Sequence, residues 1–298
     1  MSFEPKGIIP AMVTPLDDRD RINEPMLRTL VRYLLDAGVH GLFAVGSQGE
    51  FYALTDEEKQ TITELVVREA NGRVPVYIGT GAITTKESIL LTAMAEKAGA
   101  DAVSIITPCY ISPSENELYE HYTAIARSTT LPVLLYSNPG RTHINMSPEL
   151  VHKLSEMDNI VGIKDSSGDL SLTAQYIRNT SPRFSVLMGR DTLIYGALMY
   201  GARGAIAATA NIAPRLVVDI YEAYARGDFE QAKNAQADLA PLRHAFSLGS
   251  FPAVIKDALQ LMGMAVGPPR GPIRPLDSAA RAELQNILRR LRLPEIGA

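Results

Sequence analysis

A regular alternation of apolar runs and helical segments restricts the folds open to this chain. Eight short runs are continuously apolar, which is typical of strands buried on both faces of a parallel sheet. These runs are GIIPAMVT (7–14), GLFAV (41–45), PVYIGT (75–80), AVSIITP (102–108), PVLLYS (132–137), IVGIKD (160–165), FSVLMG (184–189) and GAIAAT (204–209). Their starts lie about 20–35 residues apart, which is the spacing of a repeated strand–helix unit.

Segments with helical periodicity lie between the runs. They include residues 24–37, 55–70, 86–98, 115–127 and 192–200. Several of the helical segments follow residues that cap helices well, such as Thr55, Ser114 and Ser147. Eight strand–helix units within about 225 residues predict a (β/α)8 TIM barrel, and a doubly wound open sheet is the alternative.

The strand pattern stops near Ala213 and only helical patterns follow. These cover residues 214–226, 229–246, 253–262 and 278–291, with a Pro- and Gly-rich connector at 266–277. We therefore expect a barrel over residues 1–225 that carries the catalytic site, and a C-terminal helical extension over residues 226–298.

Composition and simple sequence patterns argue against several other classes of protein. The formal net charge of −4 argues against nucleic acid as the main partner, and no apolar stretch is long enough for a membrane span. The N-terminus does not resemble a signal peptide, and the single cysteine, Cys109, excludes an internal disulfide. The five histidines show no metal-binding spacing. A cytoplasmic protein without a metal is expected.

Lys164 is the most unusual residue of the apolar runs, because it stands at the end of IVGIK. Active sites of barrels form at the C-terminal ends of the strands, so this lysine is placed where chemistry occurs. A dry environment favours the neutral amine, which is the form that attacks a carbonyl to give a Schiff base. The alternative is a strand-end lysine in an ion pair with Asp165 or Asp169.

Three further features fall at the same end of the predicted barrel. Tyr136 precedes Lys164 by one strand–helix unit, and its phenol could act as an acid or base, although a core tyrosine is the alternative. The loop GSQGE (46–50) offers backbone N–H groups and the Ser47 hydroxyl to an anion, or is simply a turn. Arg141 could bind a carboxylate through two N–H groups, or be a surface arginine.

These motifs together resemble the dihydrodipicolinate synthase / N-acetylneuraminate lyase family of class I aldolases. The resemblance covers nearly the whole chain. It rests on GSQGE followed by FYALT, TPCYISPSENELYEHY, PVLLYSNPGRT, IVGIKDSSGD, GAIAATAN and, in the helical tail, FPAVIKDAL (251–259).

The resemblance implies specific roles for the residues of these motifs. Lys164 matches the lysine that forms a Schiff base with pyruvate, and Tyr136 matches a proton-relay tyrosine. Ser47, together with the backbone amide of Gln48, would hold the pyruvate carboxylate. No metal and no organic cofactor is implied.

Further positions are implied to contact the second substrate or a neighbouring subunit. Tyr110 matches a tyrosine that reaches into the neighbour's site, and Ile206 matches a residue whose carbonyl faces the site. Arg141 would bind the second substrate, and Gly189 and Asp191 in the GRDT loop would line its pocket. Family members are commonly dimers of dimers, so a homotetramer is expected.

The second substrate is less clearly indicated. Arg141 and Tyr110 favour condensation of pyruvate with aspartate semialdehyde. Gln48 and Arg190, however, change the size and polarity expected of that pocket. A 2-oxo-3-deoxy-sugar-acid or 4-hydroxy-2-oxoglutarate aldolase or dehydratase is the alternative. A non-catalytic binding relative is disfavoured because Lys164 is retained.

Overall fold

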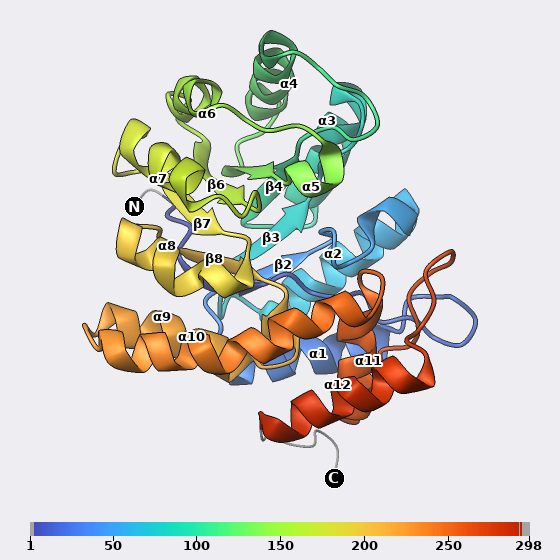
Figure 1. Ribbon diagram of the computed structural model, residues 1–298. Coiled ribbons are helices and arrows are strands. Elements are labelled where there is room, and N and C mark those ends of the chain that lie inside the picture. Colours follow the sequence, from blue (N-terminus) through green and yellow to red (C-terminus); the bar gives the residue numbers. More distant parts are fainter. Residues whose placement is uncertain (1–2, 292, 294–298) are drawn as a thin grey trace.

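Eight parallel strands form the barrel in the computed structural model, which describes residues 3–291 and 293 (Figure 1). The strands are β1 (Gly7–Pro10), β2 (Leu42–Ala44), β3 (Val76–Gly79), β4 (Ala102–Ile106), β5 (Val133–Ser137), β6 (Ile160–Asp165), β7 (Ser185–Met188) and β8 (Gly204–Ala207). Each strand pairs with its neighbours in the order β1-β8-β7-β6-β5-β4-β3-β2. A parallel bridge between Ala11 and Phe43 joins β1 to β2 and closes the ring. The predicted barrel is confirmed, and the open sheet is wrong.

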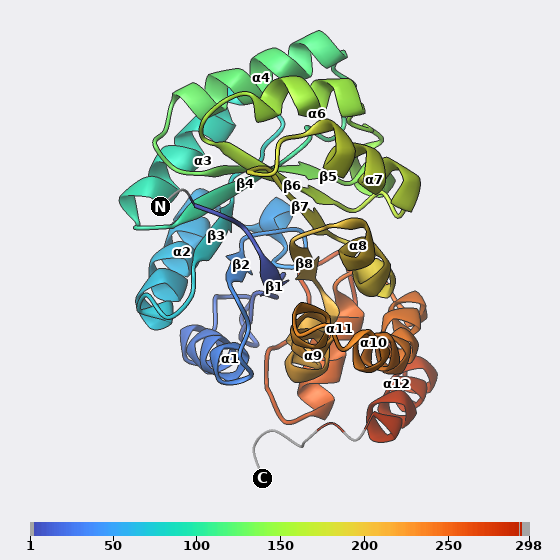
Figure 2. The same cartoon turned by 90° about the vertical axis from the view of Figure 1, so that its left-hand side faces the viewer.

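Helices alternate with the strands and surround the barrel (Figure 2). They are α1 (Glu24–Asp36), α2 (Asp56–Ala70), α3 (Thr85–Lys97), α4 (Glu115–Arg127), α5 (Pro139–Thr142), α6 (Pro148–Ser155), α7 (Leu170–Asn179), α8 (Ile194–Tyr200) and α9 (Pro214–Ala225). Thr55 and Ser114 each form a capping box, which explains why α2 and α4 begin where the sequence indicates.

The core has two layers of apolar side chains. An inner layer fills the barrel and contains Ile9, Ala11, Phe43, Tyr77, Ala102, Leu134, Leu187 and Ile206. A larger outer layer packs between the strands and the surrounding helices. Because the strands are covered on both faces, their continuous apolar character is explained.

Three more helices follow the barrel, namely α10 (Phe229–His244), α11 (Ala253–Leu261) and α12 (Ser278–Arg290). They lie beside α9 in the lower part of Figures 1 and 2. Helix α10 contacts the short helix Asp191–Leu193 after β7, and α11 contacts the short helix Thr209–Asn211 after β8. The extension therefore reaches the C-terminal ends of the strands.

The predicted division of the chain at residue 225 stays a prediction, because α9 packs both on β1 and on α10. Residues 1–2, 292 and 294–298 of the two predicted regions lie outside the described residues. No helix in the described part of the chain is long and apolar enough to span a membrane.

Candidate active site

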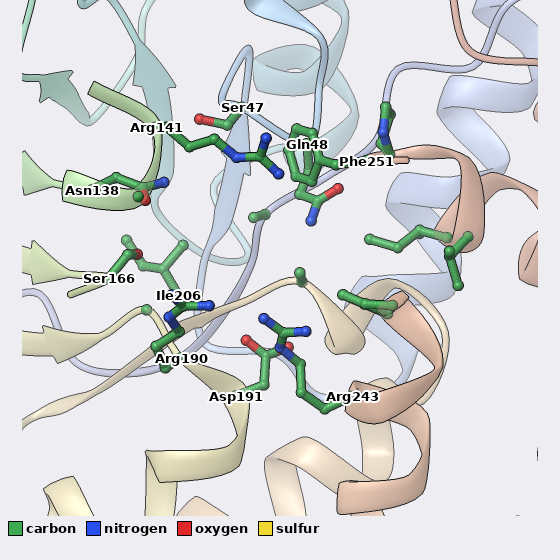
Figure 3. A pocket seen from close by; sticks show the side chains of 18 of the residues that line it. Ser47, Gln48, Asn138, Arg141, Ser166, Arg190, Asp191, Ile206, Arg243 and Phe251 are labelled. Carbon is green, nitrogen blue, oxygen red and sulfur yellow. The ribbon is translucent and has the colours of Figure 1, made fainter. Parts of the chain in front are cut away.

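A cavity of about 510 Å³ opens at the C-terminal ends of the strands (Figure 3). Eight of the nine site residues expected from the sequence line it: Ser47, Gln48, Tyr136, Arg141, Lys164, Gly189, Asp191 and Ile206. They come from loops or strand ends that are far apart in the chain, and the closure of the barrel brings them together. Tyr110 does not line this cavity.

Lys164, on β6, lines the cavity with only 5% of its surface exposed. Strand register places it directly beside Tyr136 on β5, and its Nζ lies 4.2 Å from the centre of the Tyr136 ring. Its Nζ also lies 5.1 Å from the centre of the Phe43 ring. The amine therefore faces two aromatic rings as well as the cavity.

The alternative ion pairs of Lys164 are wrong, since among the described residues no carboxylate lies within 4.0 Å of its Nζ. Asp165 instead accepts hydrogen bonds from the Ser167 N–H and the Thr173 hydroxyl. Asp169 caps the N-terminus of α7. Both nearby carboxylates have structural partners, so the Lys164 amine remains available to a ligand.

Tyr136 is buried next to this amine, and its hydroxyl accepts a hydrogen bond of 2.9 Å from Asn138 Nδ2. Burial opposes ionisation of the phenol and is the largest single influence on it. The Lys164 charge and hydrogen bonds from Ser47, Asn138 and Ser166 outweigh burial, so the pKa of Tyr136 lies below its ordinary value. A phenol that gives up its proton more readily suits a proton relay.

This shift leads to a measurable prediction. The phenolate absorbance that disappears in Tyr136→Phe should titrate below the usual tyrosine pKa of about 10. Lys164→Met should raise that pKa, because the neighbouring positive charge is lost. The difference between the wild type and Tyr136→Phe isolates this component from the other tyrosines, of which Tyr52 has a pKa raised by burial to about 12 and Tyr77 is shifted in the same direction. A Tyr136 component at or above the usual value would contradict the coupling.

The loop 46–50 between β2 and α2 is held in an unusual backbone conformation. Val45 before it and Glu50 at its end both have positive φ angles, 56° and 59°. A β-branched residue with positive φ is strained, and such strain is typical of functional sites. The Gly49 carbonyl accepts a hydrogen bond from Thr14 Oγ1 at 2.7 Å, which fixes the loop to the segment after β1.

Glu50 anchors this loop to the helical extension. Its carboxylate lies 2.5 Å from Lys256 Nζ on α11, and both side chains are only 1% exposed. It also accepts a hydrogen bond from the Arg270 backbone N–H, while Lys256 donates to the Pro268 carbonyl. Burial, the largest influence, lowers the pKa of Lys256, and Glu50 acts in the opposite direction. The position of Ser47 thus depends on residues more than 200 positions later in the chain.

Gly189 and Gln48 both line the cavity, and the local structure of each fits a binding site. A Cβ on Gly189 would lie 2.0 Å from Ser166 Oγ, so only glycine fits between the ends of β6 and β7. The Gln48 Oε1 is buried without a hydrogen-bond partner among the described residues. A buried acceptor of this kind is normally satisfied by a ligand or water.

Tyr110 is 96% exposed and lies outside the cavity. Its φ angle is 72°, a rare conformation for a residue with a side chain. Its predicted role in a neighbouring subunit stays a prediction. Among the described residues, no group of three or more His, Cys, Asp or Glu side chains could hold a metal ion.

Several residues of the cavity wall were not expected from the sequence, and four of them have polar or aromatic side chains that bear on the chemistry. Asn138 and Ser166 each lie two positions after a predicted catalytic residue, a spacing that returns a strand side chain to the same face. Phe251 and Arg243 come from the helical extension, and the Phe251 ring lies 4.7 Å from the Arg141 guanidinium carbon. The sequence signals for the last two are weak, because periodicity does not say where an extension docks.

A closed (β/α)8 barrel with a buried lysine and tyrosine on neighbouring strand ends defines an enzyme of the class I aldolase type. Comparison with known proteins then identifies the family. The family model for the dihydrodipicolinate synthetase family matches residues 4–291. The chain belongs to this family.

Individual relatives cover almost the full length of the chain. The chain is 41% identical over 292 residues to a 4-hydroxy-tetrahydrodipicolinate synthase of Methanopyrus kandleri, covering 97% of this chain and 96% of the relative. The enzyme of the same name from Bacillus subtilis is 39% identical, with 94% and 97% covered. Among solved structures, a prophage protein of the dihydrodipicolinic acid synthase family from E. coli, in complex with pyruvate, superposes with a TM-score of 0.93 at 35% identity, covering 97% of this chain and 99% of that one.

Proposed function

We propose that the protein is a Schiff-base-forming lyase that joins pyruvate to an aldehyde. The observation that carries this proposal is the contact between the Lys164 amine and the Tyr136 ring at the base of the cavity. An available amine beside an acid–base group is what imine formation requires. The relatives, named as 4-hydroxy-tetrahydrodipicolinate synthases, support the same chemistry.

The proposed condensation uses side chains that line the cavity. The neutral Lys164 amine attacks the pyruvate carbonyl to give a carbinolamine. Its hydroxyl takes a proton relayed by Tyr136 and leaves as water, which gives a protonated imine. The imine withdraws electrons, so the pyruvate methyl group loses a proton and an enamine forms. In this proposal Tyr136 carries protons in both steps, and Ser47 and the Gln48 amide hold the pyruvate carboxylate; the support is that all three residues line the cavity with Lys164. The enamine carbon attacks the aldehyde, and hydrolysis then frees Lys164.

The leading second substrate is aspartate semialdehyde. This assignment is supported by the names of the relatives and by Arg141, whose guanidinium lies at the cavity wall. The alternative, cleavage or dehydration of a 2-oxo-3-deoxy sugar acid or 4-hydroxy-2-oxoglutarate, uses the same lysine. The cavity wall carries two more cationic side chains besides Arg141 and Lys164, namely Arg190 and Arg243, and these support the alternative as well.

A panel of second substrates tests the proposal. Purified protein and pyruvate should consume aspartate semialdehyde faster than glyoxylate or glyceraldehyde, measured as pyruvate loss. Faster turnover of another aldehyde would replace the leading substrate and keep the reaction class. The proposal would be contradicted if no aldehyde is consumed and neither of the alternative substrates is cleaved or dehydrated.

We also propose that the protein is a cytoplasmic homotetramer in which Tyr110 completes the site of a neighbouring subunit. The support is its almost complete exposure and its constrained positive φ angle. Tyr52 and Ile83 are also large apolar side chains with about half of their surface exposed, at 54% and 41%. Exposed apolar groups of this size are common at subunit interfaces.

A further inference from the structure

The charges that line the cavity are strongly unbalanced. Among the described residues that line the cavity, four have cationic side chains, Lys164, Arg141, Arg190 and Arg243, and one, Asp191, has a carboxylate. This is notable because the whole chain has a net charge of −4. A concave wall with an excess of one charge concentrates ligands of the opposite charge.

None of the three arginines has a protein acceptor. Among the described residues, no carboxylate lies within 4.0 Å of Arg141, Arg190 or Arg243, and none of their guanidinium groups donates a hydrogen bond. By contrast, Arg270, near the same mouth, donates to Glu58 and to the Ala53 carbonyl. Arg141 is exposed, whereas Arg190 and Arg243 are half-buried, and half-buried guanidinium groups without acceptors are expected to bind an oxyanion.

Arg243 and Arg190 lie against an aromatic ring and a glycine, respectively. The Arg243 guanidinium carbon lies over the Phe246 ring at 4.9 Å. The Arg190 side chain lies against Gly168, where an added Cβ would come within 3.3 Å of its Nε. Contact through the flat face of the Arg243 guanidinium does not use its donors, so these donors stay available to a ligand.

The arginines lie on two sides of the cavity. In Figure 3, Arg141 lies beside Phe251 on one side, and Arg190 and Arg243 lie on the other. Asp191, on the side of Arg243, accepts a hydrogen bond of 2.7 Å from the Thr209 backbone N–H. Its carboxylate is therefore partly engaged by the backbone and forms no ion pair with Arg243 in the described structure.

We propose that Arg190 and Arg243 form an anion-binding subsite, separate from Arg141, for a carboxylate or phosphate of the second substrate. This inference rests on the proposed function, because it concerns the partner that the pyruvate enamine attacks. The class of partner is an aldehyde or 2-oxo acid with an anionic group remote from its carbonyl. The volume of about 510 Å³ accommodates such a partner together with bound pyruvate.

Pairs of aldehydes that differ by one anionic group test the subsite. Glyceraldehyde 3-phosphate is compared with glyceraldehyde, and succinic semialdehyde with butanal, each with saturating pyruvate. Arg190→Gln and Arg243→Gln should lower kcat/KM for the charged member of at least one pair by roughly 10- to 100-fold, while the uncharged member changes less than about two-fold. The pair that responds shows whether the subsite prefers phosphate or carboxylate.

Control variants separate this effect from general charge or folding effects. Arg178→Gln removes an exposed charge on α7 and should leave both pairs unchanged. Arg243→Lys keeps the charge but loses the two-point contact, so it should retain part of the preference. Binding of inorganic phosphate to the pyruvate-loaded enzyme, measured by calorimetry, gives a readout that needs no turnover.

Two outcomes would overturn the subsite. One is an equal loss for both members of each pair, and the other is no loss for any aldehyde. If no aldehyde is turned over, phosphate binding that is equal in the wild type and Arg243→Gln also overturns it. Borohydride trapping of pyruvate in the same preparations distinguishes the two levels, because absence of a pyruvate adduct contradicts the proposed function itself.

Discussion

Lys164→Met is expected to abolish the covalent pyruvate adduct and to lower kcat/KM by at least about 10⁴-fold, as removal of a covalent nucleophile does in other enzymes. Methionine has a similar length and fits the apolar surroundings of Phe43 and Tyr136, so the barrel should still fold. The measurement is intact mass after incubation with pyruvate and borohydride, with one pyruvyl group per wild-type chain.

Two control variants make this result specific. Lys97→Met replaces an exposed lysine at the end of α3 and should leave trapping unchanged. Lys164→Arg keeps the positive charge beside Tyr136 but cannot form an imine, so it should also fail to trap pyruvate. A pyruvyl group on Lys164→Met would mean that another lysine is the nucleophile.

Lys256→Met is expected to lower the free energy of unfolding by about 3–5 kcal/mol, because it leaves the Glu50 carboxylate buried without its cationic partner. It should also raise KM for pyruvate, since Glu50 ends the loop that carries Ser47. Urea unfolding and steady-state kinetics measure the two effects.

The double variant Lys256→Met/Glu50→Gln should recover part of the lost stability, because the unpaired charge is removed. Lys233→Met, at an exposed position of α10, serves as the matched control and should change stability by less than about 0.5 kcal/mol. Equal stability of Lys256→Met and the wild type would show that Glu50 does not need this partner.

The barrel was predictable because its signal is local and repeated. The predicted strand 160–165 coincides with β6, and the predicted helix 115–127 coincides with α4. Other strands are shorter than predicted: β1 ends at Pro10, because the backbone beyond it pairs only through single contacts such as the Ala11–Phe43 bridge. Apolar composition continues past the end of regular pairing, so composition alone overestimates strand length.

The pairing of Lys164 with Tyr136 was predictable from strand spacing, whereas the cavity wall formed by the helical extension was not. Lys164 and Tyr136 stand at equivalent positions of neighbouring strands, and the barrel rule places both at the mouth. Arg243 reaches the mouth only because α10 packs on the turn after β7. That packing depends on tertiary contacts that no periodicity in residues 229–244 specifies.

The cavity is lined both by the strand ends of the barrel and by the helical extension, and this has a consequence for how the enzyme can evolve. Lys164, the proposed nucleophile, belongs to β6, but Arg243 and Phe251 belong to the segment that follows the barrel. Mutations in that segment can alter which partner is accepted while the reactive lysine stays in place. On the proposed function, reaction type and partner choice can therefore change separately, as long as the tail keeps Lys256 and Arg270, which hold the loop of Ser47 through Glu50.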